Sequence, residues 1–155
     1  MPVLEWSDTL AIDNGVMDGV HHEFLEVLNR MAEAQGEELI PAIDAFIKHT
    51  EDHFAQEERW MEATGFPPMH CHYNQHQGVL EVARDVRKLA KNDPRYGRLL
   101  AEAVAQWFAD HVATQDTWLA QFMVQEGYEP HLLDDPHAVP EKKSGCEPAA
   151  ACGSC

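Results

Sequence analysis

The sequence predicts an all-α protein, an up-down-up-down antiparallel four-helix bundle with a short N-terminal arm and a flexible C-terminal tail. Apolar residues recur at spacings of three and four along four long segments, which is the period of an α-helix with one buried face. The connections between these segments are short, as antiparallel neighbours in a bundle require. No segment alternates convincingly between apolar and polar residues, so we expect no β-sheet.

The first two helices are bounded by residues with strong preferences for helix ends. A short arm, residues 1–17, leads to Asp18, which is suited to cap the first helix, and Gly36 lies beyond its end. Pro41 fits the first turn of the second helix, which we expect to end at Gly65, just before two consecutive prolines. This turn makes the second and third helices antiparallel.

The third and fourth helices meet at Asp93-Pro94. Asp93 can cap the fourth helix and Pro94 can take its first position, while Gly127 marks its end. Counted at the helical period, the inward-facing residues of this fourth helix are Leu100, Val104, Trp107, Phe108, His111, Trp118, Leu119 and Phe122.

Length and composition favour a single domain followed by a tail. The chain has 155 residues, which suits one domain with a hydrophobic core. We expect residues 1–130 to form the bundle and residues 131–155, where periodic apolar residues give way to proline, alanine, glycine and serine, to be flexible. The tail carries Cys146, Cys152 and Cys155, which fit a disordered extension or, alternatively, a thiol redox or metal-capture element.

The charge balance argues against two classes of partner. With 27 acidic and 11 basic residues the formal net charge is −16, whereas nucleic-acid and anionic membrane surfaces attract clusters of lysine and arginine. No apolar run approaches the ~18 residues of a transmembrane helix, so we expect no membrane insertion. The N-terminus does not read as a secretory signal, and the cysteines form no disulfide framework, so we expect a cytoplasmic location.

Metal-ligating residue types occupy the apolar stripes of all four helices. On the second and third helices they form pairs four residues apart, and each pair therefore shares one helix face. The inward set is His21 on the first helix, His53 and Glu57 on the second, His72 and His76 on the third, and His111 on the fourth. Asp116 follows five residues after His111, about 140° further round an α-helix, from where a carboxylate can still reach the bundle axis.

These residues indicate a metal site as a set, not one by one. A single histidine on an apolar face is more often a hydrogen-bonded core residue than a ligand. Five histidines and a glutamate on the inward stripes of four helices would leave many buried polar groups without partners. A metal centre would satisfy them all at once.

The number and type of ligands favour two iron ions. Seven ligands exceed one tetrahedral zinc site, and imidazole combined with carboxylate suits iron. Five imidazoles, two bridging carboxylates and one oxo or hydroxo bridge would fill all but one of the positions of two octahedral ions. The open position, on the ion with two histidines, would bind a small diatomic ligand if its pocket is apolar.

The wider sequence pattern resembles a known family. The spacings His53-x-x-x-Glu57, His72-x-x-x-His76 and His111-x-x-x-x-Asp116 occur together with Met17-Asp18 before His21, Gly65-Phe66-Pro67 in the turn, and Trp107-Phe108 before His111. Over about residues 3–127 this pattern resembles the hemerythrins, specifically their bacterial branch. Asp13 stands where that family often has a glycine.

The resemblance implies a four-helix bundle that holds two iron ions (Fe2+/Fe3+) with an oxo or hydroxo bridge and binds O2 reversibly. By this resemblance His72, His76 and His111 hold one iron, His21 and His53 hold the iron with the open position, and Glu57 and Asp116 bridge the two. An apolar O2 pocket maps to Phe24, Phe54, Trp107, Phe108 and Val112, which periodicity alone assigns to the core.

The function expected on this basis is reversible O2 binding by a carrier, store or local supplier that is not an enzyme. One alternative is a di-iron oxidase, peroxidase or NO-handling enzyme, and another is iron or redox sensing or handling assisted by the cysteine tail. The sequence contains no Glu-x-x-His pair of the kind that ferritin-like di-iron proteins use, which favours binding over turnover. The sequence indicates no particular protein partner.

Overall fold

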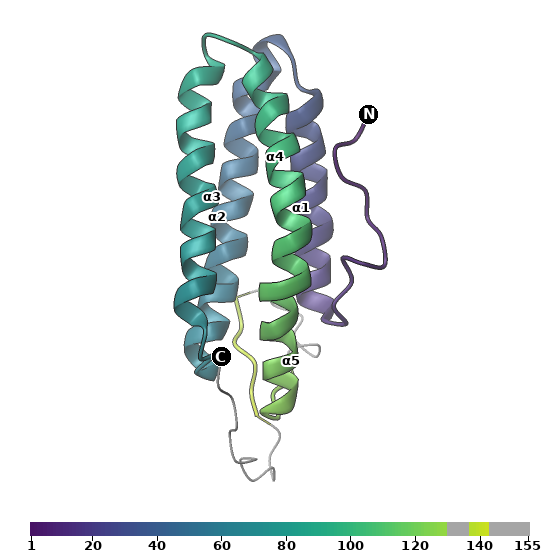
Figure 1. The fold of residues 1–155 in the computed structure, drawn as a ribbon, viewed down its shortest axis with the longest axis vertical. Coiled ribbons are helices and arrows are strands. Elements are labelled where there is room, and N and C mark those ends of the chain that lie inside the picture. The colour runs from purple at the N-terminus through teal and green to yellow at the C-terminus, as the bar shows by residue number, and fades with distance from the viewer. Residues whose placement is uncertain (130–136, 143–155) are drawn as a thin grey trace.

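The computed structural model describes residues 1–129 and 137–142, and it contains the four long antiparallel helices of a bundle (Figure 1). Each long helix packs against two others, in the order α1, α2, α3, α4 and back to α1. The prediction of an all-α four-helix bundle is confirmed. The elements are α1 (Gly15–Glu33), the 3-10 turn η1 (Gly36–Glu38), α2 (Leu39–Thr64), α3 (Met69–Ala90), α4 (Arg95–His111), the π-helical turn η2 (Val112–Asp116) and α5 (Thr117–Gln125).

Helix α1 begins earlier than predicted, because Asn14 and not Asp18 is its N-cap. The side chain of Asn14 accepts a hydrogen bond from the Met17 amide at 3.1 Å, which satisfies one of the free N–H groups of the first turn. Asp18 instead ties the arm to the helix, since its carboxylate accepts hydrogen bonds from the amides of Ile12 at 3.0 Å and Asn14 at 3.3 Å. The arm therefore ends at Asn14 and lies alongside α1 (Figure 1).

The predicted fourth helix is interrupted by a π-helical turn. Residues 112–116 form η2 between α4 and α5, and the three elements follow one another without a break. A π turn contains one residue more than an α turn, so it shifts the register of everything that follows. Of the residues predicted to face inward beyond His111, Leu119 is buried as expected but Trp118 is 51% exposed, and Met123, which was not predicted, is buried as well.

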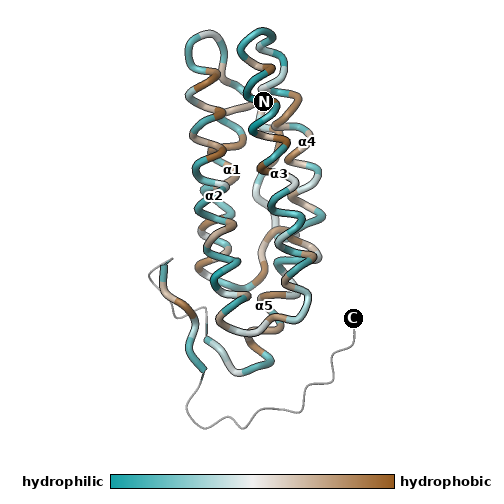
Figure 2. The backbone as a smooth tube through the Cα atoms, turned by 90° about the vertical axis from the view of Figure 1, so that its left-hand side faces the viewer, coloured by the Kyte–Doolittle hydropathy of each residue, from teal (hydrophilic) through white to brown (hydrophobic). Residues whose placement is uncertain are grey.

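The buried apolar residues form two clusters along the bundle. A large cluster contains Phe24, Phe46, Ala83 and Phe108, and a smaller one lies near the α2–α3 turn. The smaller cluster consists of Met17, Trp60, Met61, Phe66, Leu119, Ala120 and Met123. Figure 2 shows apolar stretches recurring along each helix, between hydrophilic ones.

The described part of the predicted tail contacts the bundle. Residues 137–142 lie at the end of the bundle near α5 (Figure 1), and the indole N–H of the buried Trp60 donates a hydrogen bond to the carbonyl of Ala138 at 2.9 Å. Tyr128 and Lys142 form an isolated antiparallel bridge. The other residues predicted to be flexible, including the three tail cysteines, lie outside the described residues.

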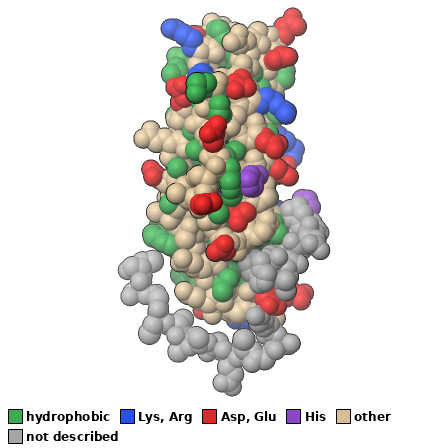
Figure 3. Space-filling view, turned by 90° about the vertical axis from the view of Figure 1, so that its right-hand side faces the viewer, with side chains coloured by type: hydrophobic (Ala, Val, Ile, Leu, Met, Phe, Trp, Pro, Cys, Tyr) green, Lys and Arg blue, Asp and Glu red, His purple; other side chains and the backbone are tan. Residues whose placement is uncertain are grey.

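The surface matches the acidic composition. On the face shown in Figure 3, acidic side chains are spread along the bundle with basic side chains scattered among them. Within the described ranges, no helix is both long enough and apolar enough to cross a membrane.

Candidate metal centre

The seven side chains predicted as ligands come together inside the bundle. All seven are buried, with at most 3% of any residue exposed. Along each helix they lie between residues of the two apolar clusters. Their ligand atoms form two overlapping groups, within each of which all atoms lie within 4.8 Å of one another: Glu57, His72, His76, His111 and Asp116, and His21, His53, Glu57 and Asp116.

The first group, which we call the three-histidine group, is organised around one oxygen of each carboxylate. Asp116 Oδ1 lies 3.0 Å from His111 Nε2 and 3.1 Å from His72 Nε2. Glu57 Oε2 lies 3.1 Å from His72 Nε2 and 3.2 Å from His76 Nε2. Three ring nitrogens and two carboxylate oxygens thus converge from α2, α3, α4 and η2.

The second group, which we call the two-histidine group, uses the other oxygen of each carboxylate. Glu57 Oε1 lies 2.8 Å from His53 Nε2 and 3.6 Å from His21 Nε2. Asp116 Oδ2 lies 3.2 Å from His21 Nε2. Glu57 and Asp116 therefore each face both groups, as two bridging carboxylates would.

The π turn explains how Asp116 reaches this position. In a π turn the backbone pairs residue i with residue i+5, so residues five apart lie close to one face. His111 is the last residue of α4 and Asp116 the last residue of η2, and both side chains point into the same group. In a regular α-helix Asp116 would lie about 140° away from His111.

The two carboxylates favour protonation of several of the surrounding histidines. Burial opposes protonation of His21 and of His72, but the carboxylates of Asp116 and Glu57 outweigh burial and raise the pKa of each to about 9. Burial lowers the pKa of His53 to about 4, which Glu57 only partly offsets. Burial would raise the pKa of both carboxyls, yet the imidazoles around them hold each pKa below its ordinary value. Cations at this position would replace those protons.

Comparison with known proteins agrees with this geometry. A sequence model described as the Hemerythrin HHE cation binding domain matches residues 14–122, a range that contains all seven side chains. The chain belongs to the hemerythrin family. A protein named bacteriohemerythrin from Ralstonia nicotianae is 46% identical over 126 residues, which cover 78% of this chain and 92% of the relative.

More distant relatives of the same name extend this similarity. Bacteriohemerythrin from Stenotrophomonas maltophilia is 28% identical over 120 residues, and that from Pseudomonas aeruginosa is 27% identical over 120 residues. Each alignment covers 75% of this chain and 78% of the relative. The predicted resemblance to the hemerythrins is confirmed.

The donor set fits the metal centre that the hemerythrin family implies. Within the described part of the chain, both oxygens of Asp116 and both ring nitrogens of His21 are buried without a hydrogen-bond partner. Two of these atoms, His21 Nε2 and Asp116 Oδ2, lie only 3.2 Å apart. Buried polar groups are almost always hydrogen-bonded, so atoms that converge without bonding one another are best satisfied by a cation between them.

The aromatic residues predicted to line an O2 pocket divide between the two groups. Phe24 stacks on Phe108 with 4.4 Å between the ring centroids. Phe108 in turn lies edge-on to the ring of His21, in the two-histidine group, at 5.1 Å. Phe54 stacks on His76 at 3.8 Å in the three-histidine group and also lies 5.3 Å from the His53 ring, and Trp107 stacks on His111 at 4.4 Å. Val112 is fully buried in the large apolar cluster that also contains Phe24 and Phe108.

Two polar contacts of the ligands were not predicted. Gln75 Oε1 accepts a hydrogen bond from His111 Nδ1 at 2.8 Å, and Glu58 Oε1 accepts one from His76 Nδ1 at 3.4 Å. Both acceptors are sequence neighbours of predicted ligands. Their positions in the sequence did not distinguish them from ordinary exposed polar residues on a helix.

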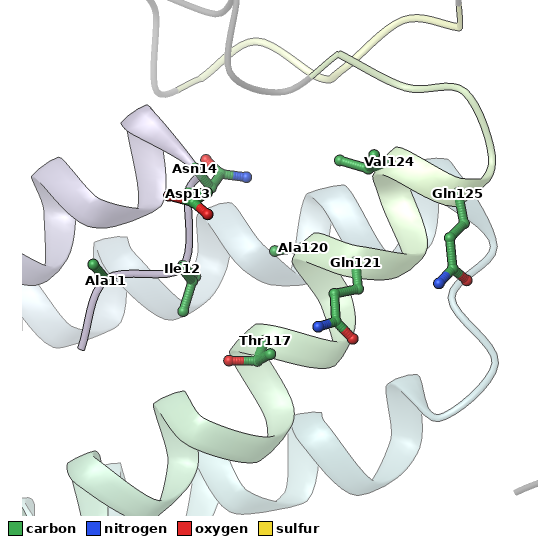
Figure 4. A pocket seen from close by; sticks show the side chains of 9 residues that line it. All are labelled: Ala11, Ile12, Asp13, Asn14, Thr117, Ala120, Gln121, Val124 and Gln125. Atoms are coloured by element: carbon green, nitrogen blue, oxygen red, sulfur yellow. The ribbon is translucent and has the colours of Figure 1, made fainter. Parts of the chain in front are cut away.

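A pocket of about 400 Å³ lies outside the centre, between the N-terminal arm and α5 (Figure 4). Thr117, which follows Asp116 directly, lies on its wall, but none of the seven side chains does. The pocket therefore contributes nothing to the metal centre itself. Its lining residues are Ala11, Ile12, Asp13, Asn14, Thr117, Ala120, Gln121, Val124 and Gln125.

Proposed function

We propose that the seven side chains hold two iron ions joined by an oxo or hydroxo group, and that this centre binds O2 reversibly. The protein would then be an O2 carrier, store or local supplier and not an enzyme. The observation that carries this proposal is the division of the two carboxylates, because Glu57 and Asp116 each direct one oxygen to three histidines and the other to two. The group with fewer histidines offers one protein ligand fewer, which would leave a coordination position for an exchangeable ligand.

The chain supplies binding, charge and shielding to this centre. When bound, the iron ions would supply the electrons on which reversible O2 binding depends. His72, His76 and His111 would hold one ion, His21 and His53 the other, and Glu57 and Asp116 both. The protons that His21 and His72 carry in the metal-free cluster would leave as the ions bind.

The apolar surroundings favour binding over turnover. Phe24 and Phe108, both fully buried, contact the rings of His53 and His21 on the two-histidine side. Such a wall excludes water and external protons, which would otherwise promote irreversible oxidation of the centre. The family membership of the chain and the bacteriohemerythrin names of its relatives support the same assignment.

Iron quantitation combined with air cycling tests this proposal. We expect two iron ions per chain, and a visible absorption band that appears when the anaerobically reduced protein meets air and disappears when O2 is removed. His111→Ala should lose the band and bind less iron. His70→Ala, which changes an exposed histidine on the same bundle, is the matched control and should keep both.

Each other outcome contradicts a particular part of the proposal. Irreversible bleaching accompanied by an oxidised product would favour an oxidase or another enzyme. A band and iron content unchanged in His111→Ala would show that the ligand assignment is wrong. Binding of a single ion per chain would remove the bridging roles of Glu57 and Asp116.

A further inference from the structure

The outer nitrogen of His111 has a defined partner. His111 Nε2 faces the three-histidine group, 3.0 Å from Asp116 Oδ1 and 3.2 Å from His76 Nε2. A neutral imidazole that offers Nε2 to a cation must carry its proton on Nδ1. Gln75 Oε1 lies 2.8 Å from that Nδ1, so the side-chain carbonyl of Gln75 accepts a hydrogen bond from the Nδ1–H group.

The side chains around this contact are otherwise apolar. Gln75 and Trp107 line an apolar groove of about 430 Å³ between α3 and α4, and Trp107 stacks on the His111 ring. The remaining lining residues are all aliphatic or glycine: Gly78, Val79, Val82, Leu100, Ala103 and Val104. Among the described residues that line this groove, Gln75 is therefore the only one whose side chain can accept a hydrogen bond.

The other ligands are held differently. His76 Nδ1 donates to Glu58, a charged carboxylate, at the longer distance of 3.4 Å. Among the described residues, the Nδ1 atoms of His21, His53 and His72 are buried without a hydrogen-bond partner. His111 thus has the shortest of these outer hydrogen bonds, and its acceptor is a neutral amide.

We propose that Gln75 is a positioning residue that selects the Nδ1–H tautomer of His111, fixes its ring, and limits the basicity of this ligand by being neutral. An acceptor behind a ligating histidine sets its tautomer and orientation, and a carboxylate in that place raises the basicity of the ring more than an amide does. This inference rests on the proposed iron centre. A more basic ligand stabilises Fe3+ over Fe2+, so the glutamine helps to keep the reduced, O2-binding state accessible.

Two variants at this position separate orientation from charge. Gln75→Leu removes the acceptor, and we expect iron to be bound about 10–100-fold more weakly in competition with a chelator, the usual range when such a partner is removed. Gln75→Glu keeps an acceptor of the same length, so it should retain iron, but its charge should lower the reduction potential and speed autoxidation about 10-fold. Gln77→Leu, two residues away on α3 and outside the groove, is the matched control and should change neither.

A readout that needs neither iron nor O2 makes the test independent of the proposed function. In zinc-loaded protein, the imidazole nitrogen resonances should show His111 as the Nδ1–H tautomer in the wild type and in Gln75→Glu, and a mixture of tautomers in Gln75→Leu. Identical tautomer and metal-retention behaviour in all three proteins would overturn the role of Gln75. Normal tautomer selection in a protein that fails the air-cycling test would instead overturn only reversible O2 binding.

Discussion

The stability of the metal-free protein is expected to fall as the pH rises from about 6.5 to 9. In the folded chain the pKa of His21 and of His72 is raised from 6.5 to about 9, because the carboxylates of Asp116 and Glu57 outweigh the effect of burial. A group that binds its proton more tightly when folded stabilises the folded state fully below its unfolded pKa, and that contribution disappears as the pH rises through the folded value.

The size of the effect follows from these pKa values. A tenfold change in proton affinity is worth about 1.4 kcal/mol, so each histidine contributes on the order of 3 kcal/mol to the free energy of unfolding. Both histidines face the same two carboxylates, which makes their contributions less than additive. We therefore expect a total loss of about 3–6 kcal/mol, equivalent to a fall of roughly 10–20 °C in Tm for a domain of this size.

Urea unfolding of chelator-treated protein, followed by circular dichroism between pH 6 and 9.5, measures this loss. His72→Gln should remove a large part of the pH dependence, whereas His70→Gln, at an exposed position on the same helix, should leave it unchanged. Metal-loaded protein should lack the decline, because cations replace the protons. Stability that stays flat or rises over this interval in the metal-free wild type would refute the reasoning.

Two further predictions concern the π turn and the contact of Trp60 with residues 137–142. Deleting Ala113 removes the extra residue of η2, so a regular α turn would place Asp116 four residues after His111 and on the same face. We therefore expect the deletion variant to keep two iron ions per chain and its helix content by circular dichroism; a loss of iron would contradict the view that the π turn serves to bring Asp116 onto the face of His111. Trp60→Phe removes the N–H that donates to Ala138, so unfolding free energy should drop by about 1 kcal/mol and trypsin should cleave faster at Lys142. Trp118→Phe, at an exposed position, is the control for the second variant, and equal cleavage rates in the two variants would refute the anchoring role.

The spacing of apolar residues predicted both the bundle and the convergence of the ligands. A helix that is buried on one face needs apolar residues every three or four positions, and this repeat is visible in the sequence. The pairs His53–Glu57 and His72–His76 share a helix face by spacing alone, and the structure places both pairs in the centre. That these residues bind iron stays a prediction. The start of α1 was misplaced because Asn14 and Asp18 are both good capping residues, and only the folded arm decides between them.

The π turn could not be predicted from apolar spacing. Beyond His111 an α-helical count brings both Trp118 and Leu119 inward, whereas with the extra residue of η2 Leu119 and Met123 are buried and Trp118 is exposed. One hint was available, because Asp116 lay off the predicted inward face although its residue type suited the centre. A ligand that is out of register with its helix indicates either a long reach or an irregular turn, and here the turn is irregular.

The two groups of ligands also differ in how firmly the protein holds them. In the three-histidine group, His76 and His111 each have an aromatic ring stacked against one face and a polar acceptor at Nδ1. In the two-histidine group, the described residues supply phenylalanine contacts but no acceptor for the Nδ1 atoms of His21 and His53. Fixed tautomers and rings keep one metal position constant, while ligands held mainly by apolar packing can adjust when a small molecule binds and leaves. Under the proposed function this division of labour suits reversible binding, because O2 would bind at the adjustable position while the rigid one retains the centre.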